Sequence, residues 1–267
     1  MFRARVIPCL LLRNLGLVKT IKFKNPTYLG DPINIVKIFN DKEVDELVFL
    51  DIEATTVNKA PPFKLLEKVA TEAFMPLGYG GGIRKLEDIK TILGLGFEKI
   101  VVNSYAVENR QFIRKASDFA GNQSIVVSID VKKNMWGKYE VFTHSGKKST
   151  RLDPVKYAID MEKLGAGELL LNSIDQDGTM QGYDIELVRR VTNEVTIPVI
   201  ACGGACTVMD LGAAVKQGGA SAAAAGSMFV FQGRHRAVLI TYPTQKDLQN
   251  ELNIINNMSC CHRLIGN

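Results

Sequence analysis

The sequence has little of what several protein classes require. Its 267 residues include one Trp, three His and five Cys, and 23% are charged. No segment reaches the roughly 18 consecutive apolar residues of a membrane span, and Arg3, Arg5 and Pro8 stand where a secretory signal has its apolar core. These features exclude disordered, collagen-like and coiled-coil chains, and they predict a globular cytoplasmic protein with no membrane partner.

The cysteines are too few, and odd in number, for a disulfide framework, which favours reduced thiols. Cys202 and Cys206 are separated by three residues, but the only histidine near them is His235, so a zinc site would lack its other ligands. The run Cys260–His262 could hold a metal or fray, and fraying is favoured. We expect no metal and no cofactor.

The net charge is modest, because 33 Lys and Arg stand against 28 Asp and Glu to give +5. The densest basic cluster is Lys132, Lys133, Lys147 and Lys148. A nucleic-acid partner would require a basic stripe with aromatic platforms, which is lacking. The charge suits an anionic small molecule better.

Short β-branched segments alternate along the chain with longer amphipathic ones. The predicted strands are 5–12, 46–52, 76–79, 99–103, 124–130, 168–174, 198–202 and 220–226. The predicted helices are 32–44, 63–74, 85–95, 107–120, 154–164, 185–194 and 208–217. Eight strand and helix units predict a single (β/α)8 barrel over residues 1–267, with a core at about 1–232 and a divergent C-terminal segment at 233–267.

A repeated segment indicates that the barrel is a duplicated half-barrel. The sequence Pro76-Leu-Gly-Tyr-Gly-Gly-Gly-Ile returns 122 residues later as Pro198-Val-Ile-Ala-Cys-Gly-Gly-Ala. Asn103-Ser104 and Gly226-Ser227 follow the two copies at nearly equal distances. The repeat therefore puts matching turns at the carboxyl ends of strands in both halves.

These turns are typical of phosphate sites, where glycine backbone N–H groups and helix N-termini converge on an anion. The first predicted site comprises Gly81, Gly82, Asn103 and Ser104. The second comprises Gly203, Gly204, Gly226 and Ser227, with Asp177, Gly178 and Thr179 nearby. Two such sites imply a substrate with a phosphate at both ends, or one that lies across the barrel mouth.

Carboxylates at the carboxyl ends of strands are candidate acids and bases. For Asp51 and Asp175, a helix cap or loop hydrogen bond explains the residue equally well. Asp130 differs, because it ends the apolar run Ile125-Val-Val-Ser-Ile, where a buried carboxylate costs free energy unless it has a partner or a task. We therefore predict that Asp130 is catalytic.

The chain resembles one family, the cyclase subunit of imidazole glycerol phosphate synthase, over about residues 1–232. The segments that carry the resemblance are Ile7-Pro-Cys-Leu, Val18-Lys, Glu46-Leu-Val-Phe-Leu-Asp-Ile, Gly80-Gly-Gly-Ile-Arg, Ile125-Val-Val-Ser-Ile-Asp, Gly165-Ala-Gly-Glu-Leu-Leu-Leu-Asn-Ser-Ile-Asp-Gln-Asp-Gly-Thr and Ile197-Pro-Val-Ile-Ala-Cys-Gly-Gly-Ala. The resemblance implies a barrel through which ammonia from a partner glutaminase, bound at the N-terminal face as a heterodimer, reaches a bisphosphorylated ribosyl substrate. Two aspartates would act as general acid and base in this lyase-type ring closure.

One of those two aspartates is missing. The resemblance makes Asp130 one of them and gives Lys19 a role in holding the substrate. The other should follow Pro8-Cys9-Leu10, where this chain has Leu11. Overlaying 7–12 on 126–131 also places Leu11 opposite Asp130. Losing one member of an acid–base pair typically costs about 10² to 10⁴ in rate, so efficient ring closure is not expected.

Four charged residues match the ring that forms the ammonia entrance in the family. Arg5, Glu46, Lys99 and Glu168 begin four of the predicted strands. The alternative is a set of rim salt bridges, each worth about 0 to 1 kcal/mol when exposed. Because charges aimed at a barrel floor are costly without a use, we favour the gate.

An intact gate with an incomplete acid–base pair resembles the cyclase-like branch encoded with surface polysaccharide genes, which works beside a sugar amidotransferase to install an acetamidino group. Leu10-Leu-Leu, Phe23-Lys-Asn-Pro and Ser227-Met-Phe-Val-Phe carry this resemblance. The basic insertion Gly233-Arg-His-Arg either binds a substrate phosphate or is a solvated loop, and 245–255 could form a polar helix. The alternatives are an authentic histidine-pathway cyclase, and an isomerase relative or inactive barrel that only binds phosphate.

Overall fold

The fold is described from a computed structural model, which defines residues 3–233 and 235–252. Arg234, the end of the predicted helix 245–255 and the run Cys260–His262 therefore lie outside the described residues. None of the described helices is long and apolar enough to cross a membrane.

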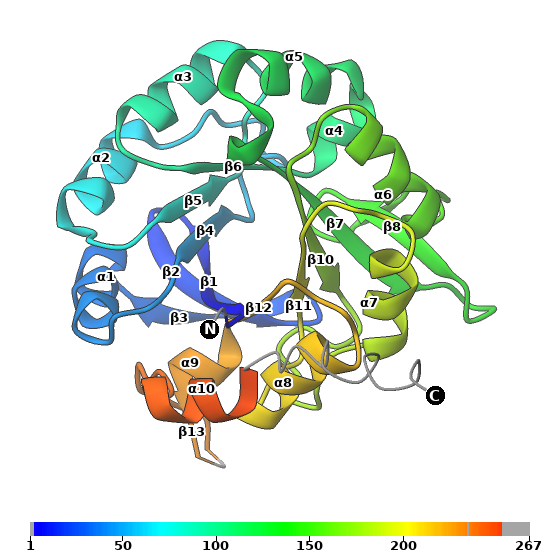
Figure 1. The fold of residues 1–267 in the computed structure, drawn as a ribbon. Helices are drawn as coiled ribbons and strands as arrows, with labels where there is room; N and C mark the ends of the chain where they lie inside the picture. The colour runs from blue at the N-terminus through cyan, green and yellow to red at the C-terminus, as the bar shows by residue number, and fades with distance from the viewer. Residues whose placement is uncertain (1–2, 234, 253–267) are drawn as a thin grey trace, which may run out of the picture.

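Eight parallel strands form a closed barrel, as the sequence predicts (Figure 1). They are β1 (Arg5–Arg13), β4 (Leu47–Asp51), β5 (Leu77–Gly80), β6 (Lys99–Val102), β7 (Ile125–Lys133), β10 (Glu168–Ser173), β11 (Val199–Cys202) and β12 (Ala222–Ala225). The pairing of β6 with β7 joins the two halves, and the pairing of β12 with β1 closes the ring. All eight expected strands are present, each within a few residues of its predicted bounds.

Helices surround this ring, and their positions follow the amphipathic pattern (Figure 1). They are α1 (Pro32–Asp41), α2 (Phe63–Glu72), α3 (Leu86–Gly94), α4 (Ser104–Glu108), α5 (Gln111–Ala120), α6 (Pro154–Lys163), α7 (Ile185–Thr192), α8 (Val208–Lys216), α9 (Ser227–Val230) and α10 (Gln245–Leu252), with a 3-10 turn η1 (Asn122–Ser124). Asp31 and Asp153 cap α1 and α6 through their side chains, and each precedes a proline at the first helical position.

One predicted helix is wrong in its extent. The segment 107–120 is two helices, because Asn109 leaves the helical region with φ −139° and ψ 83°. The first of them, α4, begins at Ser104, at the predicted first phosphate site. The longer α5 then packs Phe112, Ile113 and Ala116 against the barrel.

Two separate apolar clusters hold the fold together. The larger fills the layer between the barrel and the helices. The smaller lies inside the barrel and contains Ile7, Cys9, Val48, Val101, Val126, Leu170, Ile200, Cys202, Ala222 and Ala224, with Leu50 packed against them. The side chains that point into the barrel are shortest on β12, where all four residues are alanine and buried. The inside of the barrel is therefore apolar, and its side chains are smallest along β12.

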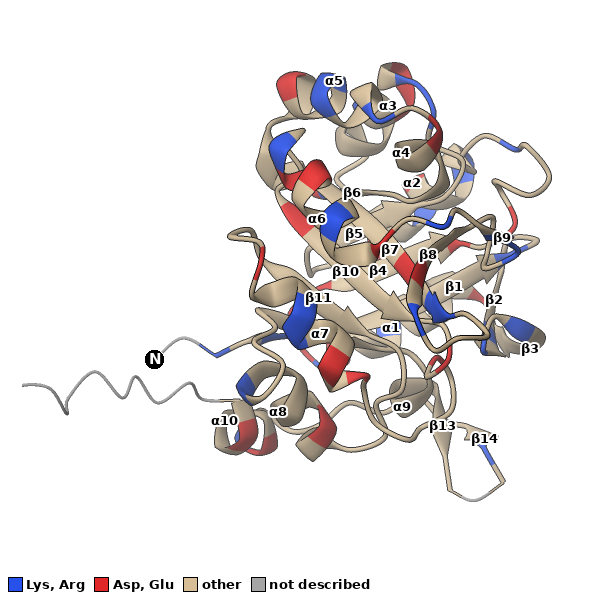
Figure 2. Ribbon diagram, turned by 90° about the vertical axis from the view of Figure 1, so that its right-hand side faces the viewer, with Lys and Arg blue, Asp and Glu red and all other residues tan. Residues whose placement is uncertain are grey.

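Two of the barrel strands extend into antiparallel hairpins that the sequence pattern did not predict. β1 continues into β2 (Gly16–Ile21) and β3 (Lys24–Gly30), and β7 continues into β8 (Tyr139–Thr143) and β9 (Lys148–Ser149). Because β1 and β7 begin the two halves of the barrel, these matched extensions agree with the predicted duplication. Figure 2 shows them on the side opposite the N-terminus.

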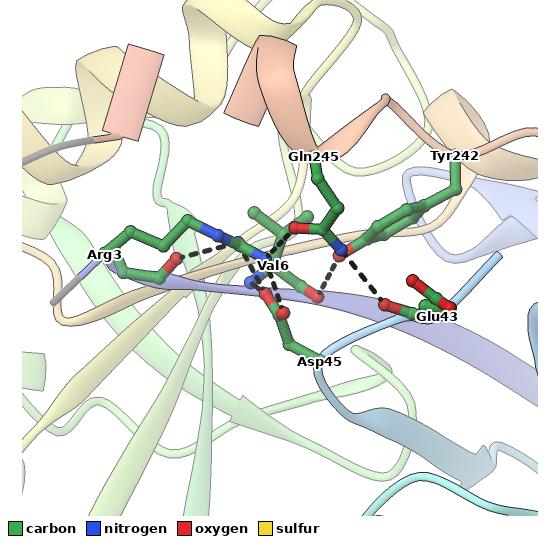
Figure 3. Close-up of polar contacts among 7 residues, drawn as sticks. Arg3, Val6, Glu43, Asp45, Tyr242 and Gln245 are labelled. Atoms are coloured by element: carbon green, nitrogen blue, oxygen red, sulfur yellow. Dashed lines mark hydrogen bonds and ion pairs between the residues drawn. The ribbon is translucent and has the colours of Figure 1, made fainter. Parts of the chain in front are cut away.

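The C-terminal segment returns to the N-terminal end of the barrel, where it contacts the start of the chain (Figure 3). The Tyr242 hydroxyl donates a hydrogen bond of 2.9 Å to the Val6 carbonyl. Gln245 accepts from Arg3, whose guanidinium also pairs with Asp45 at 2.7 Å. The first and last described segments thus fasten the same edge of the barrel floor.

Candidate active site at the barrel mouth

A cavity of about 110 Å³ lies at the carboxyl ends of the barrel strands. Asp130 of β7 and Leu11 of β1 both line it, together with Lys19 of β2. The other residues along its wall are Cys9, Thr20, Phe23, Leu50, Asp51, Ile52, Thr55, Gly80, Gly81, Val101, Asn103, Ser104, Ser128, Ser145, Asn172, Asp177, Cys202 and Gly226. The cavity therefore brings the two expected acid–base positions and part of both predicted phosphate sites together.

Asp130 is buried, and its surroundings favour the protonated form. Burial raises the pKa of Asp130 to about 7, and the like charge of Asp177 adds to this rise. The polar side chains of Ser128 and Asn103 beside it act in the opposite direction. A carboxyl group with a pKa near neutrality can both give and accept a proton at physiological pH. Asp130 thus has the properties of a general acid or base.

Lys19 lies on the other side of Asp177 and neutralises it. Its Nζ is 2.8 Å from Asp177 Oδ1, and both side chains are buried. The neighbouring Thr20 hydroxyl donates to Asp177 Oδ2 at 3.3 Å. A Cβ atom at Gly226 would stand 2.9 Å from Lys19 Cε, so glycine at 226 makes room for this side chain. The pair fixes a cation at the edge of the cavity.

The two halves of the barrel present opposite polarity to the cavity. Leu11 pairs with Leu50 in the parallel register of β1 and β4, and Asp130 pairs with Asn172 in that of β7 and β10. Leu11 and Asp130 are also the first barrel-side residues that pair with the following hairpin strand. One half therefore contributes two leucines where the other contributes a carboxyl and an amide, in agreement with the predicted equivalence of Leu11 and Asp130.

Asn172 is a site residue that the sequence argument missed. Its Oδ1 is buried and has no hydrogen-bond partner among the described residues, although the side chain lines the cavity. An unpaired buried amide oxygen costs about 1 to 3 kcal/mol unless a ligand or water satisfies it. The period of two along β10 could have identified it, since Glu168, Leu170 and Asn172 face the same way.

The predicted phosphate turns divide into residues at the cavity and residues behind it. Gly81, Asn103, Ser104 and Gly226 line the cavity, whereas Gly82, Gly178, Thr179, Gly203, Gly204 and Ser227 do not. Two of these glycines also have a packing reason. Gly82 has φ +70° and would clash with the Lys59 carbonyl if it carried a Cβ, and Gly204 has φ +112° and would clash with the Gly182 carbonyl. Glycine at these two turns therefore does not by itself require an anion.

Other side chains of the predicted sites are held by local hydrogen bonds. The Ser104 hydroxyl donates to Asn103 Oδ1 at 3.1 Å and accepts from the His144 N–H at 2.9 Å. The Thr179 hydroxyl donates to the Gln176 carbonyl at 2.7 Å. These local contacts are enough to position the two hydroxyls at the turns.

The side chains of Asp51 and Asp175 accept hydrogen bonds from backbone N–H groups, which is the cap or loop role that the sequence left open for them. Asp51 Oδ1 accepts from the N–H groups of Glu53 and Ala54, each at 2.9 Å. Asp175 Oδ2 accepts from the Lys133 N–H at 2.9 Å.

The candidate zinc pair is split, because Cys202 is buried in the cavity wall while Cys206 is exposed. Within the described residues, no three metal-ligating side chains gather.

The four predicted gate residues meet at the opposite end of the barrel. Arg5 pairs with both Glu46 and Glu168, and Lys99 Nζ lies 3.5 Å from Glu168 Oε2. Lys99 also donates a hydrogen bond of 2.7 Å to the Gln123 carbonyl, and it forms no ion pair with Glu46. Three of the four possible links are therefore present, and the ring is open between Lys99 and Glu46.

The carboxylates of this ring are buried, although burial disfavours the charged form of a side chain. Burial raises the pKa of Glu46, and the attraction of Arg5 offsets this only in part. Burial lowers the pKa of Arg5, but the charges of Glu168 and Glu46 outweigh it, so the pKa is raised. Arg5 is the cation that pairs with both carboxylates, and Lys99 pairs with Glu168 as well. They are not exposed rim pairs, since Glu46 and Glu168 are only 3% and 2% exposed.

Taken together, the molecule is a (β/α)8 barrel with an acid at its mouth, where such barrels carry out their chemistry, and a ring of buried charges at its floor. Residues 5–236 match the family model described as histidine biosynthesis protein, and the chain belongs to that family.

Named relatives cover almost the whole chain. Imidazole glycerol phosphate synthase subunit hisF2 of Pseudomonas aeruginosa is 51% identical over 243 residues, which span 91% of this chain and 97% of the relative. The corresponding HisF subunit of Leptospira interrogans is 49% identical over 251 residues, 92% of this chain and 98% of the relative. Subunit hisF3 of Vibrio vulnificus is 46% identical over 255 residues, 95% of this chain and 98% of the relative.

Proposed function

We propose that this chain is the cyclase-type synthase subunit of a glutamine amidotransferase system. It accepts ammonia from a separate glutaminase at the barrel floor and delivers it to a phosphorylated acceptor at the mouth. The observation that carries the proposal is the alignment of three features along one barrel. These are the buried ring of Arg5, Glu46, Lys99 and Glu168, the apolar cluster inside the barrel, and the cavity with Asp130.

The order of these features suits neutral ammonia. An apolar interior disfavours ammonium, because a charge without a partner is costly to bury. Within the described residues, Lys99 pairs with Glu168 and not with Glu46, and we propose that ammonia enters on this side of the floor ring. At the mouth, the nitrogen adds to a carbonyl carbon of the acceptor, and the π electron pair of the C–O bond moves onto the oxygen as the nitrogen becomes positively charged. Asp130, with a pKa of about 7, takes the surplus proton from the nitrogen in its ionised form and returns it to that oxygen.

The acceptor we favour is the one used by the acetamidino-sugar branch, with a sugar amidotransferase as the further partner. Leu11 supports this choice, because a side chain that can neither give nor take a proton stands where ring closure requires the second carboxylate. The paired Leu50 extends the apolar wall on the same side. In this role the barrel passes ammonia to an acceptor handled with that third protein.

The gate is tested by the source of nitrogen. The complex of this chain with its glutaminase and the sugar amidotransferase is supplied with glutamine or with ammonium chloride, and product is measured per glutamate released. Glu46→Ala and Lys99→Ala should lower the yield from glutamine and leave the yield from ammonium unchanged. Lys90→Ala, an exposed lysine on α3, is the matched control. An unchanged yield from glutamine in both gate variants would contradict the channel.

The second candidate is an authentic imidazole glycerol phosphate synthase cyclase, which the names of the relatives and the retained Asp130 favour. It is tested with the bisphosphorylated ribosyl substrate, using the parent chain and Leu11→Asp. The favoured proposal expects little turnover by the parent and a gain of about 10² or more in Leu11→Asp. Substantial turnover by the parent would establish the cyclase and remove the sugar role.

A further inference from the structure

The hairpin that follows the last barrel strand places an arginine over the second predicted phosphate site. β13 (Phe231–Gln232) pairs with β14 (Ala237–Val238), and this hairpin lies beyond α9 in Figure 2. Arg236 lies in the turn, with φ 51° and its N–H bonded to the Gly233 carbonyl at 3.1 Å. A non-glycine residue in this region of φ is uncommon outside turns.

The guanidinium of Arg236 contacts two of the predicted site residues at once. Nη1 donates to the Gly178 carbonyl at 3.1 Å, and Nη2 lies 3.4 Å from the Ser227 hydroxyl oxygen. Gly178 belongs to the loop after β10 and Ser227 begins α9 after β12. One side chain from the insertion thus bridges two loops of the predicted second phosphate site.

Arg236 carries a charge that no carboxylate of the described residues compensates. It is half-buried, and it forms no ion pair within that part of the chain. The nearest acid of that loop, Asp177, is already paired with Lys19. The guanidinium instead lies over the Phe231 ring, with its central carbon 4.6 Å from the ring centroid. A stacked guanidinium keeps its planar set of donors oriented at a small cost in side-chain entropy.

The geometry points to Arg236 as the side-chain ligand that binds a phosphate group of the acceptor at the second site. The present partners, a carbonyl and a hydroxyl, are neutral and occupy only part of the five N–H donors of the guanidinium. A phosphate oxygen pair is the preferred bidentate partner of such a fork. Gly203 and Gly204 lie in the turn beside this loop, where the Gly182 N–H bonds to the Gly204 carbonyl at 2.8 Å. That the phosphate belongs to the ammonia acceptor rests on the proposed function. The phosphate site itself does not depend on it.

Inorganic phosphate is the probe for the anion site itself. Binding to the full chain is followed by NMR, with the amide signals of Gly178 and Ser227 reporting the second site and those of Gly82 and Ser104 reporting the first. We expect Arg236→Gln to raise the dissociation constant at the second site at least tenfold while the first site keeps its affinity. Arg236→Lys, which keeps the charge but not the fork, should lie between the two.

A matched arginine controls for net charge. Arg151 is exposed and forms no ion pair with the described residues, so Arg151→Gln removes the same charge far from the loop after β12. It should leave both dissociation constants within twofold of the parent. Equal loss at both sites in Arg236→Gln, or no loss at the second site, would overturn the assignment. Neither result depends on ammonia transfer, so failure here is distinguishable from failure of the proposed function.

The kind of phosphate is decided by two further probes. Methyl phosphate represents a terminal phosphomonoester, and dimethyl phosphate represents the diester type found inside a nucleotide sugar. The unshared guanidinium charge favours the dianion, so methyl phosphate should bind more tightly than dimethyl phosphate, by tenfold or more, and lose this preference in Arg236→Gln. Equal binding of the two probes by the parent would exclude a monoester preference at Arg236.

Discussion

Lys19 and Asp177 form a buried ion pair, with Nζ 2.8 Å from Oδ1, at the edge of the cavity that contains Asp130. The resemblance gives Lys19 the task of holding substrate, but in this structure its charge is matched by a carboxylate. A substrate anion that binds Lys19 must therefore share it with Asp177. The pair also keeps a negative group near Asp130 without leaving a net charge in the cavity wall.

Breaking this pair from one side should destabilise the protein strongly. Lys19→Met leaves the Asp177 carboxylate buried without its cation, and such losses are typically about 3 to 5 kcal/mol. Urea unfolding measures the change. Lys19→Met combined with Asp177→Leu should recover much of the loss, because neither charge remains. If the double variant were as unstable as Lys19→Met alone, the pair would not be the cause.

Asp130 should make stability fall as the pH rises. Its folded pKa is about 7 against an ordinary value of 3.8, so the folded protein keeps a proton that the unfolded chain has lost. Its contribution is therefore fully present below about pH 4, declines between pH 4 and pH 7 and is lost above, with a slope of up to about 1.4 kcal/mol per pH unit. Asp130→Asn stays neutral and should remove this decline.

Urea unfolding at several pH values between 4 and 8 measures the difference between Asp130→Asn and the parent. The variant should match the parent near pH 4 and exceed it at pH 8. Asp118→Asn, at an exposed position of α5, is the control and should run parallel to the parent throughout. A parallel curve for Asp130→Asn as well would mean that the carboxyl is ionised in the folded protein at all these pH values.

Asn172 should matter for transfer and not for stability. Asn172→Leu copies the equivalent position, Leu50, and removes an amide oxygen that has no partner among the described residues. The free energy of unfolding should stay within about 1 kcal/mol or rise, since an unsatisfied polar group is lost. Product formation from ammonium chloride should fall tenfold or more. Asn193→Leu, at an exposed helix end, is the control, and full activity of Asn172→Leu would remove Asn172 from the site.

Tyr242 should contribute to the barrel floor through one hydrogen bond. Tyr242→Phe removes the donor to the Val6 carbonyl and keeps the ring, whose centroid lies 5.3 Å from that of Phe229. The expected loss is about 1 kcal/mol in the free energy of unfolding. Tyr28→Phe, at an exposed tyrosine, should change it by a few tenths of a kcal/mol at most. Equal effects of the two substitutions would show that the contact is not formed in solution.

The barrel itself was predictable because its strands and helices repeat in a regular order. The hairpins of β1, β2 and β3 were not, because their turns lack the usual residues. Arg13 pairs with Gly16 across Asn14 and Leu15, and Ile21 pairs with Lys24 across Lys22 and Phe23. All four turn residues have positive φ, a region that Asn-Gly normally signals in such turns. Leu15 and Phe23 give no such signal in the sequence.

The site was predictable where a residue type is costly without a use. Asp130 stood out because a carboxylate at the end of an apolar strand requires a partner or a task. The four floor charges were identified through the resemblance, and the structure shows the ion pairs that three of the four possible links form. Asn172 was missed because a neutral amide costs less free energy to bury than a charge, so its presence in an apolar strand does not by itself indicate a function. The glycine turns were ambiguous for a further reason. Close backbone approach at Gly82 and Gly204 selects glycine just as an anion would.

The alanine strand β12 makes the barrel lopsided. Ala222 and Ala224 project only methyl groups inward, and they pair with Ile7 of β1 and with Ile200 and Cys202 of β11. The side chains inside the barrel are therefore shortest along β12, next to the place where the first and last barrel strands meet. Ammonia that crosses the barrel, as proposed above, would then pass beside β12 and not along the central axis. A bulky replacement such as Ala224→Leu would obstruct ammonia on this side of the barrel, whereas a larger side chain in place of Val126 of β7 would not.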